Sequence, residues 1–400
     1  MFENIKSKFP VFIKKPNLVF LDTAASALKV NDMIKAVNNC YSFEYSNIHR
    51  GVYDLSAKLT QKFENSRNNI SDFIFAPSYE NIIFTKNATE AINLVATSYT
   101  QDFIKEGDEI IISYLEHHAN IVPWHIAQKL HKFKLVPVDI NDIGEINYKD
   151  LLEKVNSKTK LISLTHMSNV TGAITDFEKI NDIRNKFNIP LLIDGCQFTP
   201  HHGLNIKELN PDFYVFSAHK LYGPSGLGIL YMKDKWLEIL GPYQGGGSMI
   251  ENVNILDTTY AQGNQKFEAG TPPITQVIGF SAAIDFLKSL DMKKVFSYEC
   301  ELHDYTLEQL KSINDFKIYG NSKNKGSLIS FNIEGLHHND VALLLNQKNI
   351  AIRSGHHCAQ PLMKKLNITG SARASFGVYN NKEDVDHFVE SIKDIKNFIK

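Results

Sequence analysis

Residues 213–232, FYVFSAHKLYGPSGLGILYM, place a lysine in a short polar turn between two apolar runs. The first run ends at Ser217, and His219 and Lys220 occupy the turn before a glycine and a proline break the chain. Continuous apolar runs of this length are typical of strands covered on both faces of a sheet. Because α/β sheets bind ligands at the carboxyl ends of their strands, the turn predicts a ligand site. An amine held there, partly out of water, can form a Schiff base, although a solvated surface lysine is the commoner case.

Similar apolar runs recur along the chain and alternate with segments of helical periodicity. The runs that indicate strands are 17–22, 81–85, 108–113, 133–139, 160–166, 189–194, 212–217 and 227–232. This alternation predicts an α/β fold with a large, mainly parallel sheet over residues 17–290. After residue 290 the regular alternation of strand-like and helical segments ends, and we predict a smaller α+β domain formed by residues 1–16 and 291–400.

Composition excludes several classes of function. A formal net charge of −1 over 400 residues does not fit a nucleic-acid-binding protein, which needs a basic excess. We expect no membrane span, because no stretch approaches about 18 uninterrupted apolar residues, and we find no secretory or transit signal. The four cysteines are scattered without CxxC spacing. We therefore expect no disulfide framework, no metal site and a reducing, cytoplasmic location.

Pyridoxal phosphate (PLP) is the cofactor that uses such a lysine, and its chemical needs can be checked against the sequence. The pyridinium nitrogen needs a carboxylate, and Asp194 ends the apolar run IPLLID, although an aspartate there is also a common turn former. Gln197 follows three residues later and could reach the phenolic oxygen of the cofactor. Both residues thus follow a strand-like run, as the lysine does.

The phosphate and the ring of PLP make two further demands. A phosphate suits a helix N-terminus, and Asn87 followed by Glu90 predicts a capping box that opens a helix beside Thr89. Such a cap is routine by itself. The ring needs a stacking partner, and His117 and His118 follow a third strand-like run. A histidine there is more often structural, but the pair gains weight from the lysine and the aspartate.

Stretches spread over residues 21–363 resemble class V aminotransferase-type PLP enzymes and, more closely, the SufS-like group II cysteine desulfurases. They include, in family order, LDTAASAL, IHRGVYDLSA, NATEAINLVA, EHHANIVPW, IDGCQ, SAHKLYGPSGLGIL, FEAGTPP and RSGHHCAQPLM. The resemblance implies PLP-dependent fold type I, L-cysteine as the substrate and a homodimer. Two positions depart from the family pattern, because Ala91 stands where glycine is expected and Cys196 where alanine is usual.

The resemblance also implies roles for individual residues. Lys220 matches the Schiff-base lysine and proton shuttle, His117 the stacking residue and acid/base helper, and Cys358 the nucleophile. The implied cofactor-binding residues are Thr89, His117, Asp194, Gln197, Ser217, His219, Lys220 and, donated by the other subunit, Thr271. The implied substrate-binding residues are Asn169, Arg353, Arg373 and His49.

The stretch AIRSGHHCAQ, residues 351–360, allows three interpretations of Cys358. A zinc site needs three or four converging ligands, whereas His356, His357 and Cys358 are consecutive, so their side chains diverge. An inert buried cysteine is the general expectation. However, a glycine and a proline bracket the segment as a loop, and loops on a rigid scaffold carry function. Neighbouring histidines could favour the reactive thiolate, so we favour the nucleophile.

The function implied by the resemblance is conversion of L-cysteine into L-alanine, with the sulfur held as a persulfide on Cys358. The sulfur would then pass to an acceptor protein of the Suf system for iron–sulfur cluster assembly. Selenocysteine lyase is the alternative on the same scaffold, whereas kynureninase-like or aminotransferase activity would not need this cysteine. A sulfur-relay protein without catalysis would lack Lys220 or Asp194, and both are present. The short run from Arg353 to Cys358 predicts a constrained nucleophile and slow turnover without an acceptor.

Overall fold

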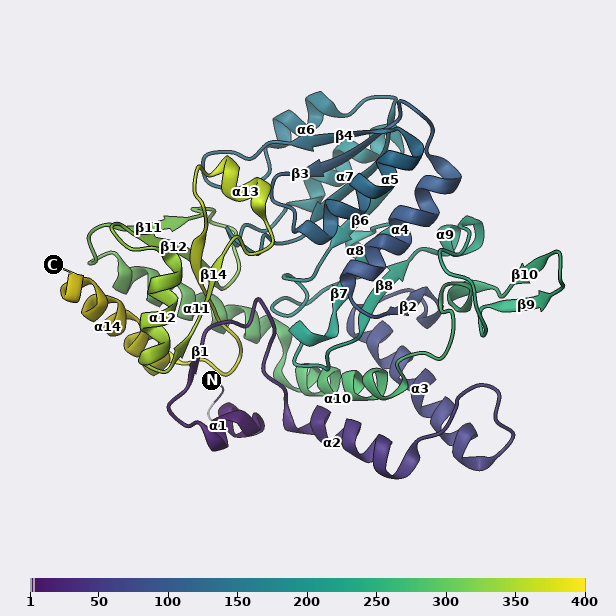
Figure 1. Ribbon diagram of the computed structural model, residues 1–400, viewed down its shortest axis with the longest axis horizontal. Helices are drawn as coiled ribbons and strands as arrows, with labels where there is room; N and C mark the ends of the chain where they lie inside the picture. The colour runs from purple at the N-terminus through teal and green to yellow at the C-terminus, as the bar shows by residue number, and fades with distance from the viewer. Residues whose placement is uncertain (1, 3, 400) are drawn as a thin grey trace.

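The computed structural model describes residue 2 and residues 4–399 of the chain. Figure 1 shows a large sheet flanked by helices on one side of the molecule and a smaller sheet with its own helices on the other. The large sheet has seven strands in the order β2 (Ile82–Thr85), β8 (Gly228–Met232), β7 (Phe213–Ser217), β6 (Leu191–Asp194), β5 (Thr159–Thr165), β3 (Glu109–Ser113) and β4 (Lys134–Val138). The five strands from β7 to β4 run parallel, while β8 is antiparallel to both of its neighbours. The predicted α/β class with a mainly parallel sheet is confirmed.

Alternate side chains of each central strand enter two different cores. In β7, Phe213 and Val215 pack in one hydrophobic cluster, whereas Tyr214 and Phe216 pack in the other. Successive side chains of a strand point to opposite faces of the sheet. Because both faces are covered by helices, no position of β7 is left for a polar residue, and the strand is continuously apolar up to Ser217.

Ten α-helices lie among the described residues before residue 291. They are α1 (Pro10–Lys14), α2 (Asn31–Asn39), α3 (Asp54–Phe73), α4 (Ala88–Phe103), α5 (Val122–His131), α6 (Tyr148–Lys154), α7 (Phe177–Phe187), α8 (Ile206–Leu209), α9 (Asp234–Ile239) and α10 (Ile274–Leu290). Helices α4, α5 and α9 contribute to one core cluster, and α2, α3, α7 and α10 to the other. Strands β9 (Ile250–Val253) and β10 (Thr258–Tyr260) form a hairpin that projects from the body in Figure 1.

The C-terminal part of the chain builds a second, antiparallel sheet with its own core. Its strands lie in the order β11 (Phe316–Tyr319), β12 (Leu328–Ile333), β15 (Ser371–Ser375) and β14 (Arg353–Gly355). Its helices are α11 (Met292–Leu310), α12 (His338–Gln347), α13 (Gln360–Lys365) and α14 (Lys382–Ile399). Helix α10 ends one residue before Asp291 and α11 begins one residue after it. The division into two domains near residue 290 stays a prediction.

One predicted strand lies outside the large sheet. The run 17–22 forms only β1 (Val19–Phe20), which pairs in parallel with β13 (Ile350–Ala351). Leu21 N–H continues this pairing by donating to the Ala351 carbonyl, and Asp22 forms a bridge with Ser375. The run resembled the strands of the large sheet because Val19 and Leu21 are equally buried, but they pack in the core of the second sheet. Among the described residues no helix is both long and apolar enough to cross a membrane.

A column of stacked rings crosses from the large sheet to α11. His166 stacks on Phe198 with ring centroids 3.4 Å apart, Phe198 stacks on His202 at 4.1 Å, and His202 meets Phe296 at 3.8 Å. Burial lowers the pKa of His202 to about 3. The histidine is therefore a neutral aromatic ring at neutral pH.

We predict that His202→Phe will flatten the pH dependence of stability. In the unfolded chain a histidine binds a proton below about pH 6.5, whereas His202 in the folded protein does so only below about 3. Unfolding between these values takes up a proton, so stability falls as the pH falls. The free energy of unfolding should therefore fall by roughly 2 kcal/mol less between pH 7 and pH 5 in His202→Phe than in the wild type. Urea unfolding of both proteins at the two pH values measures the difference, and identical pH dependence would contradict the prediction.

Candidate active site

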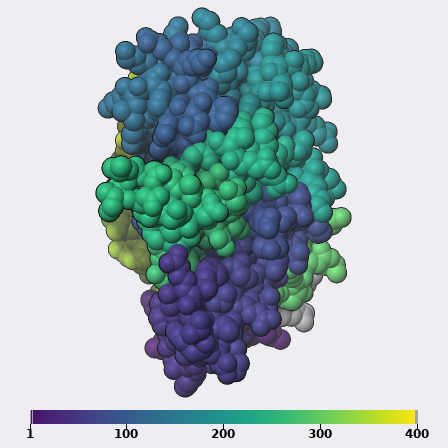
Figure 2. All heavy atoms as spheres, turned by 90° about the vertical axis from the view of Figure 1, so that its right-hand side faces the viewer, coloured from purple at the N-terminus to yellow at the C-terminus, as the bar shows by residue number. Residues whose placement is uncertain are grey.

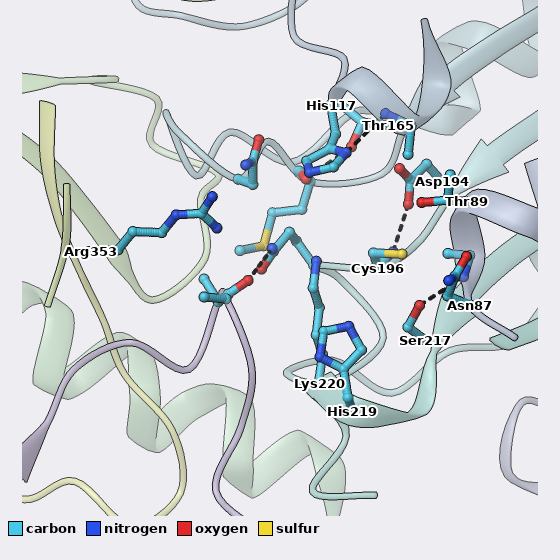
Figure 3. A pocket seen from close by; sticks show the side chains of 17 residues that line it. Asn87, Thr89, His117, Thr165, Asp194, Cys196, Ser217, His219, Lys220 and Arg353 are labelled. Atoms are coloured by element: carbon cyan, nitrogen blue, oxygen red, sulfur yellow. Dashed lines mark hydrogen bonds between the residues drawn. The ribbon is translucent and has the colours of Figure 1, made fainter. Parts of the chain in front are cut away.

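A cavity of about 290 Å³ lies at the carboxyl ends of β5, β6 and β7. Figure 3 shows Lys220, Asp194 and His117 directed into it from three different segments. Nine of the predicted site residues line this cavity: Thr89, His117, Asn169, Asp194, Gln197, Ser217, His219, Lys220 and Arg353. The tertiary structure therefore brings together at one point residues that are up to 264 positions apart in the sequence.

The turn that carries Lys220 is fixed through the carbonyl of the residue before it. His219 O accepts hydrogen bonds from Ala27 N at 3.1 Å and from Lys29 Nζ at 2.9 Å. The imidazole of His219 contacts Ser26 Oγ at 3.2 Å. Lys220 Nζ itself makes no hydrogen bond or ion pair with any of the described residues. Its amine is thus left available to a ligand, while the backbone beneath it is held.

The segment after β6 presents a carboxylate, a thiol and an amide to the cavity. Asp194 is 5% exposed, and its Oδ1 accepts a hydrogen bond from Cys196 N at 3.0 Å. Gln197 donates through Nε2 to Ala24 O at 2.8 Å, whereas its buried Oε1 has no partner among the described residues. A buried polar atom without a partner indicates a place for a ligand or water. Burial, followed by the charge of Asp194, raises the pKa of the Cys196 thiol, so this sulfur is a neutral group.

The N-terminus of α4 opens at the side of the cavity. Asn87 Oδ1 caps the helix by accepting from Glu90 N at 2.8 Å, but the Glu90 carboxylate reaches Lys86 N rather than Asn87 N. The helix cap is therefore present as predicted, but the second hydrogen bond of the capping box goes to Lys86 N, one residue before the N-cap. Ala88 N donates to Ser217 Oγ at 2.8 Å, which ties the helix start to the end of β7. The start of α4, with the hydroxyl of Thr89 in its first turn, suits a phosphate.

Close approach of β8 to this cap requires a glycine. A Cβ atom on Gly228 would lie 2.2 Å from the backbone of Asn87. The second glycine of the turn sequence GLG is therefore needed for the strand to pass beside the helix start.

His117 occupies the cavity as a neutral imidazole. Burial, and then the positive charge of Lys220, lowers its pKa to about 3. Its Nδ1 accepts a hydrogen bond from Ala119 N at 3.0 Å. Because one ring nitrogen of a neutral imidazole is an acceptor, the proton is assigned to Nε2.

Two arginines of the second sheet reach the same region. Arg353 and Arg373 are cross-strand partners in β14 and β15. Arg353 lines the cavity, and its Nη2 lies 3.5 Å from Cys358 Sγ. Arg373 is fully buried, donates to Asn169 O at 2.9 Å and pairs with Asp22 at 3.4 Å. Its Nε has no partner among the described residues.

The loop that carries Cys358 has an unusual backbone and is held on both sides. His357 and Cys358 have φ angles of 51° and 55°, a left-handed conformation that is uncommon for residues other than glycine. His357 O accepts from Asn169 Nδ2 and Cys358 O from His118 N, each at 2.7 Å. Burial lowers the pKa of His357 to about 2, and its Nε2 lies 2.9 Å from Ser371 O. The idea that a neighbouring histidine charge activates Cys358 is therefore wrong for His357, and the charged neighbour of this sulfur is Arg353.

Four predicted site residues are not part of the cavity lining: Cys358 and Arg373, described above, and His49 and Thr271. His49 contacts Glu64 at 2.9 Å on the side of α3. Thr271 lies in a separate hollow of about 330 Å³, which it shares with Thr85 and Lys86 at the end of β2 and with Glu90 in the first turn of α4. Their roles stay predictions.

The structure adds residues to which the sequence analysis gave no role. Ala24, Ala25, Thr165 and Met167 line the cavity. Thr165 could have been found, because it ends a strand-like run. The segment with Ala24 and Ala25 could not have been found, because small residues do not indicate a functional role. Burial lowers the pKa of Lys29 to about 8, and this lysine carried no signal at all.

The chemistry of the cavity fits PLP. It offers an unpaired amine in Lys220, a buried carboxylate in Asp194, a helix N-terminus and an unpartnered amide oxygen. These groups match a Schiff-base aldehyde, a pyridinium, a phosphate and a ring hydroxyl. The described residues include no group of three or more side chains that could hold a metal ion. The fold and the site thus define a PLP-dependent enzyme of fold type I.

Comparison with known proteins identifies the family. The model of the class V aminotransferase family matches residues 19–388, and the chain belongs to this family, whose members use PLP. A protein of Halalkalibacterium halodurans named as a probable cysteine desulfurase is 42% identical over 397 residues, which cover 98% of each chain.

Two solved structures agree with this assignment. The cysteine desulfurase CsdA of Escherichia coli, in its S-sulfonic acid form, superposes with a TM-score of 0.92 at 35% identity over 98% of this chain and 97% of the other. A cysteine desulfurase of Thermococcus onnurineus gives 0.94 at 34% identity over the same shares.

We predict that His117 stays neutral throughout the physiological range. With a pKa of about 3, its imidazole should take up no proton between pH 5 and pH 8 in the cofactor-free protein. Histidine-labelled protein can be followed by carbon–proton NMR, with His117→Gln used to assign the signal. The His117 resonance should not move over this range, and an inflection near pH 6.5 would overturn the assigned burial and tautomer.

Proposed function

We propose that this enzyme, a PLP-dependent cysteine desulfurase, converts L-cysteine into L-alanine and holds the sulfur as a persulfide on Cys358. The observation that carries the proposal is the contact between Arg353 Nη2 and Cys358 Sγ, because Arg353 also lines the cavity. The thiol therefore lies next to a residue of the cofactor cavity, although Cys358 itself is not part of the lining. The names of relatives with full-length coverage agree with this chemistry.

The cofactor would be held by groups at the strand ends. When bound, PLP supplies an electron sink for the α-carbon of an amino acid. Lys220 would hold it covalently and move the α-proton, while Asp194 would stabilise positive charge on the ring nitrogen. Thr89, Ser217, His219 and the start of α4 would bind the phosphate, and Gln197 the phenolic oxygen. His117 would lie against the ring as a neutral imidazole.

The two arginines suit the carboxylate of the substrate. A guanidinium matches two carboxylate oxygens with parallel hydrogen bonds. Arg373 is already oriented by Asn169 and Asp22, and its Nε is free of partners among the described residues. Burial lowers the pKa of Arg373 to about 10, so it remains charged at neutral pH. Binding an anion beside it would return part of the solvation that burial removed.

Cys358 would complete the reaction by taking the sulfur. Its thiolate attacks the sulfur of the substrate, an S–S bond forms, the carbon–sulfur bond breaks, and its electron pair goes to the carbon fragment. Protonation of that fragment gives alanine, so L-cysteine and a thiol yield L-alanine and a persulfide without any oxidant. The left-handed backbone at His357 and Cys358, pinned by Asn169 and His118, supports a constrained nucleophile.

The destination of the sulfur forms part of the proposal. A persulfide passes its outer sulfur to another thiol by exchange, and we assign this step to an acceptor protein of the Suf system that serves iron–sulfur cluster assembly. A cytoplasmic location suits this role. It is supported by the four cysteines, all of which are free thiols.

A homodimer is proposed from two surface features. Thr271 lies in a hollow beside the start of α4 rather than in the cavity, as suits a residue that serves a neighbouring subunit. Large apolar side chains are exposed in two segments, Tyr41, Phe43 and Val52 in one and Ile255 and Leu256 in the other. Figure 2 shows both segments on one face, in purple and green. Exposed apolar groups gathered on one face are typical of an interface.

We predict that Cys358→Ala keeps PLP but loses desulfuration. The change removes one sulfur atom from a loop and opens no large core cavity, so the cofactor spectrum should match the wild type and still respond to L-cysteine. Alanine release should fall by about 100-fold or more, as expected when a reacting group is removed. Lys220→Ala is the matched variant, which should also lose the covalent cofactor spectrum.

Mass spectrometry of the wild type after L-cysteine, without reductant, should find one added sulfur on the Cys358 peptide. Sulfur found only on the Cys196 peptide, or undiminished alanine release in Cys358→Ala, would refute the assignment. Comparison of rates on L-cysteine and L-selenocysteine separates desulfurase from selenocysteine lyase.

We also predict hybrid-dimer complementation between Lys220→Ala and Thr271→Ala. If Thr271 serves the other subunit, a hybrid has one intact site and one site with both changes. Purified hybrids should therefore recover about half of the wild-type activity per dimer, because half of the sites are intact. A monomer of full activity by light scattering, or hybrids no better than the average of the two parents, would contradict the shared site.

A further inference from the structure

A groove runs along the outside of the loop that carries Cys358. It has a volume of about 750 Å³ between α5 and α13. Its lining residues are Tyr114, His118, Ile121, Val122, His125, Gln360, Pro361, Lys364 and Lys365. None of the residues to which we assign cofactor or substrate binding belongs to this lining, so the groove is distinct from the cavity.

The wall of the groove and the nucleophile loop form one hydrogen-bonded unit. His118 N donates to Cys358 O at 2.7 Å, and Gln360 N donates to His118 Nε2 at 3.0 Å. A second hollow of about 430 Å³ adjoins α13 and shares Gln360 and Lys364 with the groove. A molecule bound in the groove would therefore contact Gln360, which is two residues after Cys358 in the chain.

The outer face of α5 adds an apolar ridge beside the groove. Val122, Ile126 and Leu130 are 47%, 56% and 73% exposed. Their spacing of four residues places them on one face of the helix. Three apolar side chains in line along a solvent-facing helix form a contact surface for an amphipathic segment.

The charge of this region differs from that of the whole chain. The formal net charge of the protein is −1, yet the lining residues of the groove and of the second hollow include no aspartate or glutamate. Lys365 is paired with Asp139 at 2.7 Å, whereas Lys364 is exposed and has no ion-pair partner among the described residues. Lys129 adds a positive charge in the last turn of α5. The surface therefore favours an acidic partner.

We propose that the groove and the ridge of α5 form the docking surface for the sulfur acceptor, which presents an acidic, amphipathic segment next to its thiol. The inference rests on the proposed function. The acceptor thiolate attacks the outer sulfur of the Cys358 persulfide, a new S–S bond forms on the acceptor, and Cys358 leaves as a thiolate. The exchange transfers one sulfur and consumes no oxidant or reductant.

A second copy of this chain fits the surface less well. A two-fold interface places the same patch on both subunits. The patch that holds Lys129 and Lys364 would then face the same positive patch of the other subunit, and like charges across an interface oppose association. An acidic partner meets the same apolar ridge with charges of the opposite sign.

The test uses two synthetic peptides in place of the unidentified acceptor. Both have one cysteine and the same leucine spacing, and they differ only in carrying glutamates or lysines at their polar positions. The holoenzyme is loaded with L-cysteine, and persulfide on each peptide is followed by mass spectrometry at low ionic strength. Dithiothreitol, which needs no docking surface, is the third acceptor.

The wild type should transfer sulfur to the acidic peptide roughly tenfold faster than to the basic one, as charge complementarity commonly changes association rates by this much or more. Lys364→Glu should abolish or invert this preference. The control is Lys294→Glu, which makes the same charge change at a lysine that is 61% exposed in the first turn of α11, where it pairs with Asp291 at 3.7 Å, and it should behave as the wild type. Alanine release driven by dithiothreitol should be the same in all three proteins.

Equal rates for the two peptides, or an unchanged preference in Lys364→Glu, would overturn the docking surface. It would also be overturned if Lys364→Glu changed the oligomeric state by light scattering but left peptide transfer unchanged, because the surface would then join copies of this chain. Failure of dithiothreitol to release alanine from the wild type would instead refute the proposed function on which the inference rests.

Discussion

Burial of one guanidinium, that of Arg373, holds the two halves of the site together. Its Nη1 donates to the carbonyl of Asn169 in the large-sheet part, and its Nη2 pairs with Asp22 in the N-terminal segment. Arg373 itself lies in β15 of the second sheet. A fully buried charge is costly unless it is paired and hydrogen-bonded, so these three segments must stay together for it to be tolerated.

The position of Cys358 depends on the same link. Asn169, whose carbonyl receives Arg373, also donates through its side chain to His357 O. This hydrogen bond and the one from His118 to Cys358 O hold two successive residues in the left-handed conformation. Each such residue costs roughly 1–3 kcal/mol and persists only where the surrounding structure imposes the conformation. The loop is therefore held in place by its neighbours rather than by its own preference, which limits how far the thiol can move.

The site owes its positive character to amines and guanidiniums and not to histidines. Burial lowers the pKa values of His117, His219 and His357 to about 3, 4 and 2, so all three rings are neutral near pH 7. Lys220 and Arg353 lie around a cavity whose lining includes one carboxylate, that of Asp194. A pocket of this kind suits the phosphate of a cofactor and the carboxylate of an amino acid. The neutral rings can stack and donate hydrogen bonds without adding charge.

The sequence by itself determined the strands of the large sheet and the chemistry at their ends. Continuous apolar runs marked β7 and β6, and polar residues such as Asp194 and Lys220 stood out because they follow such runs directly. Local spacing carries this information, since burial on both faces removes polar residues from a strand. It did not determine that the run 17–22 pairs with β13, because a buried strand has the same pattern in either sheet.

Only the tertiary structure decided which distant groups meet. Arg373 binds Asn169 and Asp22, which lie 204 and 351 residues away in the chain. The hydrogen bond from Lys29 to His219 O and the groove beside Cys358 likewise join segments far apart in the chain. The sequence could not predict that His357 is neutral either, because a pKa depends on burial and on nearby charges rather than on the adjacent residues in sequence.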